Sequence, residues 1–189
     1  RLWQWAERLG VTESRFPPRE APAPDASHPA MRVALDACIH CNLCLRACRE
    51  VQVNDVIGMA FRGHRSKIVF DQGDLMGASS CVACGECVQA CPVGALVEKD
   101  ARYQVRPWET KKVRTTCSYC GVGCQLYLHV KDNRVVKVSG VEGVAPNHGS
   151  LCVKGRYGFN FVNHPDRLTT PLIKEKGEFR EATWDEAFE

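Results

Sequence analysis

The sequence predicts an α+β protein made of small domains that fold around metal-binding cysteines. Of its 189 residues, 12 are cysteines, and they fall into three groups of four. Short alternating stretches typical of strands are separated by short stretches typical of helices. Hydrophobic residues make up 44% of the chain and charged residues 25%, as in ordinary globular proteins, which argues against a disordered chain. The length suggests one or two domains.

Charge and hydropathy exclude two classes of protein. The chain has 25 basic and 22 acidic residues, so its formal net charge is 25 − 22 = +3, which is too small to suggest a nucleic-acid partner. No apolar run approaches the roughly 18 residues that a membrane-spanning helix needs. We therefore expect neither a nucleic-acid partner nor a membrane span.

Both ends of the chain suggest a longer polypeptide. The chain starts at Arg1 and passes directly into a helix-like stretch, residues 2–9, which Gly10 closes. Near the other end, Thr183-Trp-Asp-Glu186 has the pattern of a capping box, in which Glu186 would reach back to Thr183 as N-cap. The helix that begins there has no room to finish, so we expect the chain to be a piece of a longer polypeptide.

The cysteines form three ligand sets with none left over. Two sets share the pattern C-x2-C-x2-C-x3-C, whereas the third is C-x2-C-x3-C followed after 27 residues by a fourth cysteine. The sets are Cys38, Cys41, Cys44 and Cys48; Cys81, Cys84, Cys87 and Cys91; and Cys117, Cys120, Cys124 and Cys152.

Three kinds of chemistry could use such sets. Disulfides are typical of small secreted domains that are denser in cysteine, and two-residue spacings are awkward for pairing within a run. Structural zinc sites normally use two Cys-x2-Cys pairs separated by a loop. A cubane has four iron corners, and a loop with thiolates at i, i+3 and i+6 can reach three of them, so the spacing favours iron–sulfur clusters. The six histidines are then not needed as ligands.

Two copies of the first pattern predict two interlocked clusters. In the bacterial ferredoxin run C-x2-C-x2-C-x3-C-P, the fourth cysteine binds the other cluster. Pro92 follows the second run, whereas Arg49 follows the first, and this difference affects the expected local turn rather than the ligand spacing. One 4Fe–4S cluster would take Cys38, Cys41, Cys44 and Cys91, and the other would take Cys81, Cys84, Cys87 and Cys48.

The first part of the chain divides into a linker and a two-cluster domain. Residues 1–30 combine the first helix with a linker from an upstream domain, because five of the ten prolines lie between Pro17 and Pro29. Residues 31–100 form the ferredoxin-like domain. Within it we expect strands at 31–35 and 94–97, a hairpin of 56–61 and 66–70, and helices at 43–51 and 85–90.

A second small domain is expected after a charged linker at residues 101–112, which contains Pro107. This domain, residues 113–170, is predicted to hold strands at 113–116, 125–130 and 134–138, with Asp132-Asn133 as a turn. The loop 140–149 would return the chain to Cys152, beside the other three cysteines of its set. A helix is expected at 154–164.

The surroundings of the third set resemble a known family. The stretch Cys117-Ser-Tyr-Cys120-Gly-Val-Gly-Cys124, with Gly149-Ser-Leu-Cys152-Val-Lys154 further on, resembles the N-terminal iron–sulfur domain of molybdenum or tungsten oxidoreductases. Similarity continues through 163–172 to 182–187, where such chains enter their large catalytic domain, so residues 171–189 would be its start. With a two-cluster domain in front, the chain resembles the catalytic subunit of an NAD-linked formate dehydrogenase.

The resemblance implies a fold, cofactors and partners. The fold is α+β, with a two-cluster ferredoxin-like domain followed by the small β-rich 4Fe–4S domain of the molybdopterin oxidoreductase family. The implied cofactors are three 4Fe–4S clusters, bis-molybdopterin guanine dinucleotide with molybdenum or tungsten elsewhere in the polypeptide, and further iron–sulfur clusters upstream. The partners would be subunits with flavin, NAD and iron–sulfur clusters. The substrate would be formate or carbon dioxide, and the location the cytoplasm.

The resemblance also implies a role for Lys154. In the family, the lysine two residues after the fourth ligand lies between the cluster and a pterin and helps electrons pass, whereas related nitrate reductases more often have arginine. Without the resemblance, Lys154 would be interpreted as a surface lysine on a helix. The catalytic residues of the family lie beyond Glu189, so we expect this segment of an enzyme to contain none of them.

Two alternatives stay open. One is another multi-cluster oxidoreductase, either an iron-only hydrogenase or the large peripheral subunit of respiratory NADH dehydrogenase. The active-site domain of the hydrogenase does not open with the pattern of the third set, and the NADH dehydrogenase subunit has such a set but lacks the doubled ferredoxin runs. The other alternative is a stand-alone ferredoxin-type carrier, against which the unfinished final helix argues.

Overall fold

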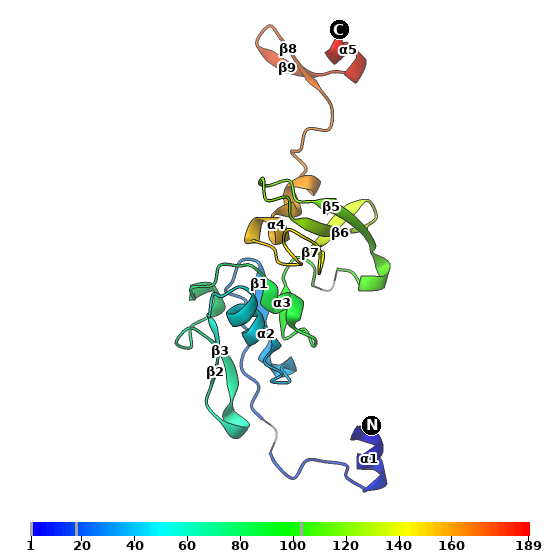
Figure 1. Ribbon diagram of the computed structural model, residues 1–189. Helices are drawn as coiled ribbons and strands as arrows, with labels where there is room; N and C mark the ends of the chain where they lie inside the picture. The colour runs from blue at the N-terminus through cyan, green and yellow to red at the C-terminus, as the bar shows by residue number, and fades with distance from the viewer. Residues whose placement is uncertain (1, 18, 103) are drawn as a thin grey trace. The chain divides into compact units, whose positions relative to one another are not determined.

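The computed structural model describes residues 2–17, 19–102 and 104–189 and divides into two units, residues 1–102 and 103–189 (Figure 1). Short helices alternate with two- and three-stranded antiparallel sheets, which confirms the expected α+β class. In the described part of the chain, no helix has the length and apolar character needed to cross a bilayer.

The first unit contains two antiparallel pairs of strands. β1 (Met31–Val33) pairs with β4 (Leu96–Glu98), so the chain closes the unit beside the strand that opens it. β2 (Ile57–Ala60) and β3 (Lys67–Phe70) form a hairpin whose connection contains the 3₁₀ helix η3 (Gly63–Arg65). All four strands lie where the sequence predicts them, although β4 begins two residues later than expected.

The helices of the first unit are short and carry the cysteine runs. α1 (Leu2–Arg8) precedes the proline-rich stretch, and α2 (Leu43–Arg46) continues without a break into a π-helical turn, η2 (Ala47–Val51). α3 (Glu86–Ala90) packs beside α2 (Figure 1). The helix expected over 43–51 is therefore one helical segment whose second half is wider than an α-helix.

The last part of the proline-rich segment is hydrogen-bonded to the rest of the first unit. Asp25 exchanges two main-chain hydrogen bonds with Val33, each 2.9 Å long. Its carboxylate accepts hydrogen bonds from the N–H groups of Met76 at 2.7 Å and Ser27 at 2.8 Å. Burial alone would raise the pKa of Asp25, but these hydrogen bonds lower it. Residues 25–28 thus tie β1 to the 3₁₀ turn η4 (Met76–Ala78).

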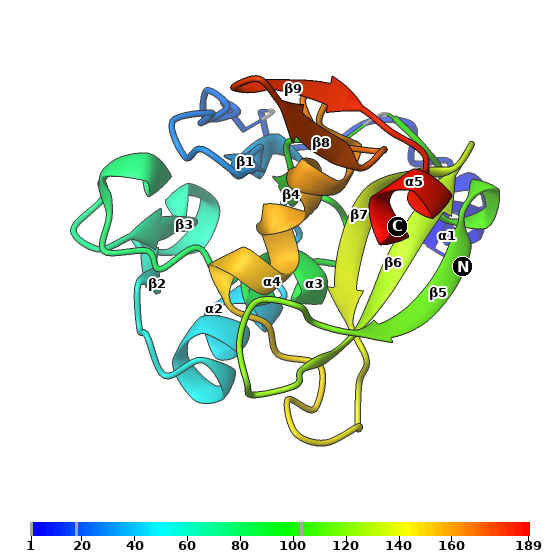
Figure 2. The same cartoon turned by 90° about the horizontal axis from the view of Figure 1, so that it is seen from above.

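The second unit is built on a three-stranded sheet. β5 (Lys111–Thr116), β6 (Gln125–Lys131) and β7 (Arg134–Gly140) lie in that order, each antiparallel to its neighbour (Figure 2). Asp132 and Asn133 form the expected turn and both have positive φ. The buried core consists of Leu126, Val135, Val138 and Leu151.

A helical segment packs against this sheet. α4 (Val153–Tyr157) lies beside β7 and continues as the 3₁₀ helix η6 (Gly158–Asn163) (Figure 2). The expected helix over 154–164 is therefore present, but it changes type at Gly158. Phe159 of η6 packs on the buried core of the sheet.

Residues 172–188 form a hairpin and a helix, of which the sequence predicted only the helix. β8 (Leu172–Glu175) and β9 (Glu178–Glu181) are antiparallel, and Lys176 and Gly177 turn the chain with positive φ. α5 (Trp184–Phe188) follows. A Lys-Gly pair between two short alternating stretches was the signal for this hairpin.

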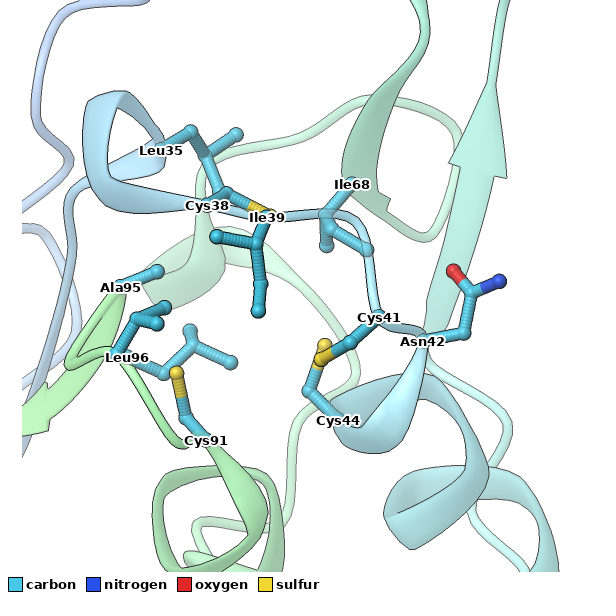
Figure 3. A pocket seen from close by; sticks show the side chains of 11 residues that line it. Leu35, Cys38, Ile39, Cys41, Asn42, Cys44, Ile68, Cys91, Ala95 and Leu96 are labelled. Atoms are coloured by element: carbon cyan, nitrogen blue, oxygen red, sulfur yellow. The ribbon is translucent and has the colours of Figure 1, made fainter. Parts of the chain in front are cut away.

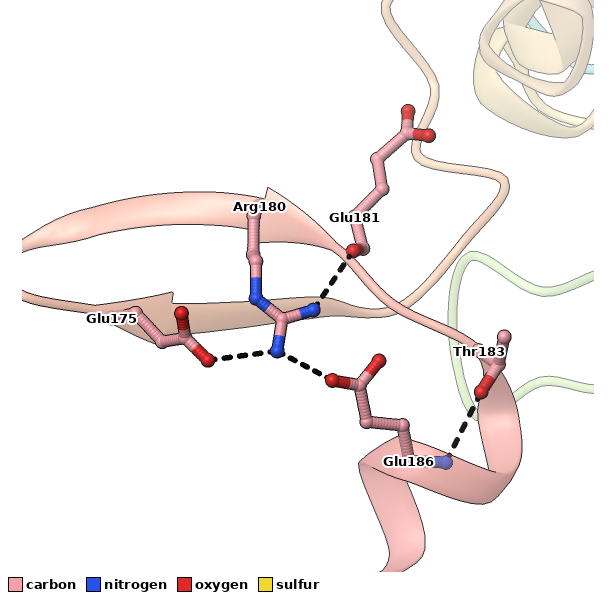
Figure 4. A network of polar contacts seen from close by, with 5 residues as sticks. All are labelled: Glu175, Arg180, Glu181, Thr183 and Glu186. Carbon is pink, nitrogen blue, oxygen red and sulfur yellow. Dashed lines mark hydrogen bonds and ion pairs between the residues drawn. The ribbon is translucent and has the colours of Figure 1, made fainter.

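The start of α5 carries the predicted N-cap and an ion pair that was not expected. Thr183 is the N-cap, and its hydroxyl accepts a hydrogen bond from the Glu186 N–H at 3.2 Å, as expected. The Glu186 carboxylate accepts from the Arg180 guanidinium, which also donates to Glu175 at 2.7 Å (Figure 4). Arg180 is the main cause that lowers the pKa of Glu186, and a hydrogen bond with the Thr183 backbone, the predicted reach back, contributes to it.

Gly77 tests the attachment of residues 25–28. A Cβ atom at this position would lie 2.6 Å from the carbonyl carbon and oxygen of Ser27, closer than such atoms approach. We expect Gly77→Ala to push the segment away and to lower the free energy of unfolding by about 1–3 kcal/mol, measured as a lower thermal midpoint. Gly58→Ala is the control, because its Cβ would meet Val69 at an ordinary 3.8 Å. Equal midpoints for the two variants would contradict this attachment.

Candidate cluster-binding sites

Cys38, Cys41, Cys44 and Cys91 line one cavity of the first unit. Cys38 and Cys41 lie on the loop before α2, Cys44 lies in α2, and Cys91 directly follows α3. Figure 3 shows Cys91 facing the loop thiols across the cavity. Its empty space, counted to the open mouth, is about 370 Å³. The lining carries no charged side chain; besides the thiols it consists of Leu35, Ile39, Asn42, Ile68, Val93, Ala95 and Leu96.

Cys48, Cys81, Cys84 and Cys87 line a second cavity of about 320 Å³. Here Cys48 lies in η2, Cys81 and Cys84 lie on the loop before α3, and Cys87 lies in α3. Apolar side chains make up most of the remaining lining, together with Asn54 and Gly85. The apolar residues are Val56, Ile57, Phe70 and Met76. Met76 belongs to the turn that Asp25 holds.

Each sequence run is therefore divided between the cavities, with three thiols in one and the fourth in the other. The helical segments α2–η2 and α3 cause this division. Cys44 and Cys48 are four residues apart, which is about 6 Å along a helix, so one segment serves two cavities. Cys87 and Cys91 have the same spacing. The groups brought together are those that the crossed assignment names, while the binding of iron by them stays a prediction.

The two cysteine loops bend at equivalent positions. His40 and Ala83 have φ values of 55° and 56°, and Asn42 and Gly85 have values of 62° and 74°. Residues with side chains rarely adopt this region, at a cost on the order of 1 kcal/mol each. The N–H groups of His40 and Ala83 donate to the Sγ atoms of Cys38 and Cys81, both at 3.4 Å. Strained loops that aim thiols and N–H groups at one point fit a bound cluster.

The acid–base state of the thiols also fits a cluster. Burial, with the neighbouring Cys38 thiol, raises the pKa of Cys44 to about 11. Burial raises the pKa of Cys87 well above its ordinary value, and Cys84 adds to the effect. Thiolates are the metal-binding form, so four of them in an apolar cavity need positive iron to stabilise them. Among the described residues, no three His, Cys, Asp or Glu side chains surround one point as a single metal ion requires.

The third set converges in the second unit. Cys117, Cys120 and Cys124 lie on the loop between β5 and β6, and Cys152 directly precedes α4. The Cys117 N–H donates to the Cys124 carbonyl at 2.8 Å and closes the base of the loop. Burial raises the pKa of Cys124, and the three other thiols add to the rise, so these three lie within electrostatic reach of Cys124.

Asn147 joins the two segments that carry the third set. Its side-chain oxygen accepts from the Gln125 N–H at 2.7 Å, and its amide nitrogen donates to the carbonyls of Gln125 at 3.1 Å and Ser150 at 2.9 Å. Gln125 follows Cys124, and Ser150 lies two residues before Cys152. The sequence offered no signal for this role beyond the position of Asn147 in the returning loop.

Two further polar contacts, which sequence reasoning missed, hold the ferredoxin-type loops. The Asp71 carboxylate accepts from the N–H and the hydroxyl of Ser80, at 2.6 and 2.9 Å, directly before Cys81. An Arg19 guanidinium nitrogen lies 3.0 Å from Nε2 of His40, between Cys38 and Cys41. His40 therefore has a hydrogen-bonding role. These pairs are separated by 9 and 21 residues, so no local pattern indicates them.

Lys154 is the second residue of α4 and is exposed beside Cys152. Its position agrees with both interpretations, a surface lysine or a residue facing a cofactor held elsewhere. Gly155 after it is buried, and a Cβ atom there would lie 3.6 Å from the Sγ atom of Cys117. The glycine therefore lets α4 approach the cysteine loop closely.

Ligand variants test the crossed grouping. Replacing Cys41, Cys84 or Cys91 by alanine removes one thiol from a cavity and should abolish the electron paramagnetic resonance (EPR) signal of that cluster. We expect Cys91→Ala and Cys41→Ala to abolish the same signal, because both residues line the first cavity, and Cys84→Ala to abolish another. Loss of the same signal in Cys91→Ala and Cys84→Ala would show that each run binds its own cluster.

Comparison with known proteins gives matches in both units. Residues 110–164 match the molybdopterin oxidoreductase Fe4S4 domain, and residues 37–95 match a 4Fe–4S dicluster domain. Three curated relatives are similar over most of the chain. "Probable oxidoreductase YjgC" of Bacillus subtilis is 34% identical over 86% of the chain, and an NADH-quinone oxidoreductase subunit of Rhizobium meliloti is 35% identical over 94%. "Putative formate dehydrogenase SH0748" of Staphylococcus haemolyticus is 29% identical over 95%.

The chain spans about a fifth of the length of these relatives, namely 20%, 21% and 22%. Among solved structures, an NAD+-reducing nickel–iron hydrogenase in the H2-reduced state is 31% identical, with a TM-score of 0.43 over 56% of this chain and 45% of that one. The two domain matches confirm the expected fold. The chain therefore carries, in order, a ferredoxin-type 4Fe–4S dicluster domain and a molybdopterin oxidoreductase Fe4S4 domain.

Proposed function

We propose that this segment conducts electrons in the catalytic subunit of a molybdenum or tungsten formate dehydrogenase. One observation carries the proposal: two interlocked four-thiol cavities precede a four-thiol site in a domain that matches the molybdopterin oxidoreductase Fe4S4 domain. The sequence resemblance favours formate as substrate, and the Staphylococcus haemolyticus relative is named for that activity.

The residues of the chain hold and shield the clusters. When bound, 4Fe–4S clusters accept and release one electron at a time. The apolar side chains of both cavities exclude water, which lowers the local dielectric constant. The N–H groups of His40 and Ala83 stabilise the thiolates of Cys38 and Cys81. In such a protein the fold supplies position and electrostatics, whereas the cofactors supply the redox chemistry.

The proposed route runs from the second unit to the first. Electrons from bis-molybdopterin guanine dinucleotide, bound elsewhere in the polypeptide, would enter at the site of Cys117, Cys120, Cys124 and Cys152, with Lys154 between the two cofactors. They would leave through the two ferredoxin-type sites toward cytoplasmic subunits with iron–sulfur clusters, flavin and NAD. Residues 1–30 and 101–112 would be linkers, and 171–189 the start of the catalytic domain.

A subunit of an NADH-quinone oxidoreductase is the second candidate. The Rhizobium meliloti relative with that name is 35% identical over 94% of the chain, so its similarity is not confined to the third set. This observation weakens the objection that such subunits lack the doubled ferredoxin runs. In this candidate the three sites would conduct electrons without formate chemistry.

Reduction of the clusters by formate tests the proposal and the role of Lys154 together. In the anaerobic full-length protein, formate should reduce the clusters. The reduction is measured as bleaching of their visible absorption. Replacing Lys154 by alanine should slow this reduction by about tenfold, equivalent to about 1.4 kcal/mol in activation free energy, with the iron content unchanged. Lys111→Ala, which removes an exposed lysine of β5, should react like the wild type.

The outcomes separate the two candidates. Clusters that NADH reduces in the assembled complex but that formate leaves oxidised would favour the second candidate. Equal formate rates for the Lys154→Ala and Lys111→Ala variants would make Lys154 an ordinary surface lysine.

A further inference from the structure

The two ferredoxin-type loops present the same backbone to their cavities. His40 and Ala83 occupy equivalent positions, have φ values of 55° and 56°, and donate N–H groups to Cys38 and Cys81 at the same 3.4 Å distance. Hydrogen bonds to sulfur raise the potential of a cluster, and these two match between the sites. Charged side chains around the loops, in contrast, differ.

A positive charge lies beside the loop of the first cavity. An Arg19 guanidinium nitrogen is 3.0 Å from Nε2 of His40, in a partly buried contact. The guanidinium keeps its charge at every physiological pH. At the equivalent position in the other loop, Ala83 has no side chain that could hold such a group.

A negative charge lies beside the loop of the second cavity. The Asp71 carboxylate is fixed by two hydrogen bonds from Ser80, at 2.6 and 2.9 Å, and Ser80 directly precedes Cys81. These bonds hold the carboxylate beside the residue that precedes a ligand of the second site. A negative charge fixed at this position opposes the addition of an electron nearby.

Three other charged residues near the two loops are paired or exposed. Arg46 forms an ion pair with Glu50 at 3.0 Å, and Arg49, next to Cys48, forms one with Asp55 at 2.6 Å. A close pair of opposite charges has little net effect at a distance. Asp36, two residues before Cys38, is exposed, so solvent screens its charge.

We propose that Arg19 and Asp71 set unequal reduction potentials for the two ferredoxin-type sites, with the site of Cys38, Cys41, Cys44 and Cys91 the higher. Reduction adds one negative charge, which the arginine stabilises at the first site and the carboxylate opposes at the second. With clusters bound, one electron would leave the second site, which is oxidised, and enter the first, which is reduced. No covalent bond forms or breaks and no proton moves. The inference rests on the proposed function, since both cavities must hold clusters.

Redox titration of the intact protein, followed by EPR, tests this assignment. Arg19→Gln should lower the midpoint of the signal that Cys41→Ala abolishes, and Asp71→Asn should raise the midpoint of the signal that Cys84→Ala abolishes. We expect each change to be about tenfold in the one-electron equilibrium constant, or about 59 mV. Arg19→Lys, which keeps the charge, should restore most of the wild-type midpoint. Arg15→Gln and Asp74→Asn, at exposed positions in the same segments, should change neither.

The results distinguish this inference from the function on which it rests. Two signals with unchanged midpoints in the Arg19→Gln and Asp71→Asn variants would overturn the charge assignment and leave electron transfer intact. The charge assignment also fails if both variants shift one signal, or if Arg19→Lys behaves like Arg19→Gln. Wild-type protein without either signal would overturn the cluster sites themselves.

Discussion

The convergence of four thiols from two separate segments is the constraint on which the first unit depends. The buried residues are few, and Cys44, Cys48 and Cys87 are among them, so the cavities stand where a larger domain would have its apolar core. Thiols packed this closely have raised pKa values and repel one another once ionised. A bound cationic iron core would remove that repulsion, and it would hold the strained residues His40, Asn42 and Ala83 that surround it.

The sequence predicted the features that depend on local spacing. Cysteine spacing predicted which thiols meet, and alternation predicted β5, β6 and β7 within a few residues. It did not predict contacts whose two partners are distant in sequence, such as Asp25 with Met76, Arg19 with His40 and Asn147 with Gln125. Glu186 shows a further reason, because its carboxylate binds Arg180, on a hairpin that was not expected, in addition to the Thr183 backbone. Polar side chains have several possible partners, and only the fold selects one.

Both units bring cysteines from two separate segments together, the first unit at two sites and the second unit at one. In the first unit a single helical segment serves two cavities, since Cys44 and Cys48 lie one turn apart. In the second unit a sheet positions the loop, and Asn147 fixes the returning segment to it. Cys41, Cys120 and Cys152 are exposed, which leaves an edge of each of those two sites open to a redox partner. In our proposal, the opposite charges of Arg19 and Asp71 give electron transfer within the first unit its direction.

The metal and sulfide content of the purified protein tests the central claim most directly. Three four-thiol sites that each hold a 4Fe–4S cluster predict about twelve iron and about twelve acid-labile sulfide per chain in anaerobically reconstituted protein. Zinc without sulfide, at about one ion per four cysteines, would contradict the binding of iron–sulfur clusters at these sites.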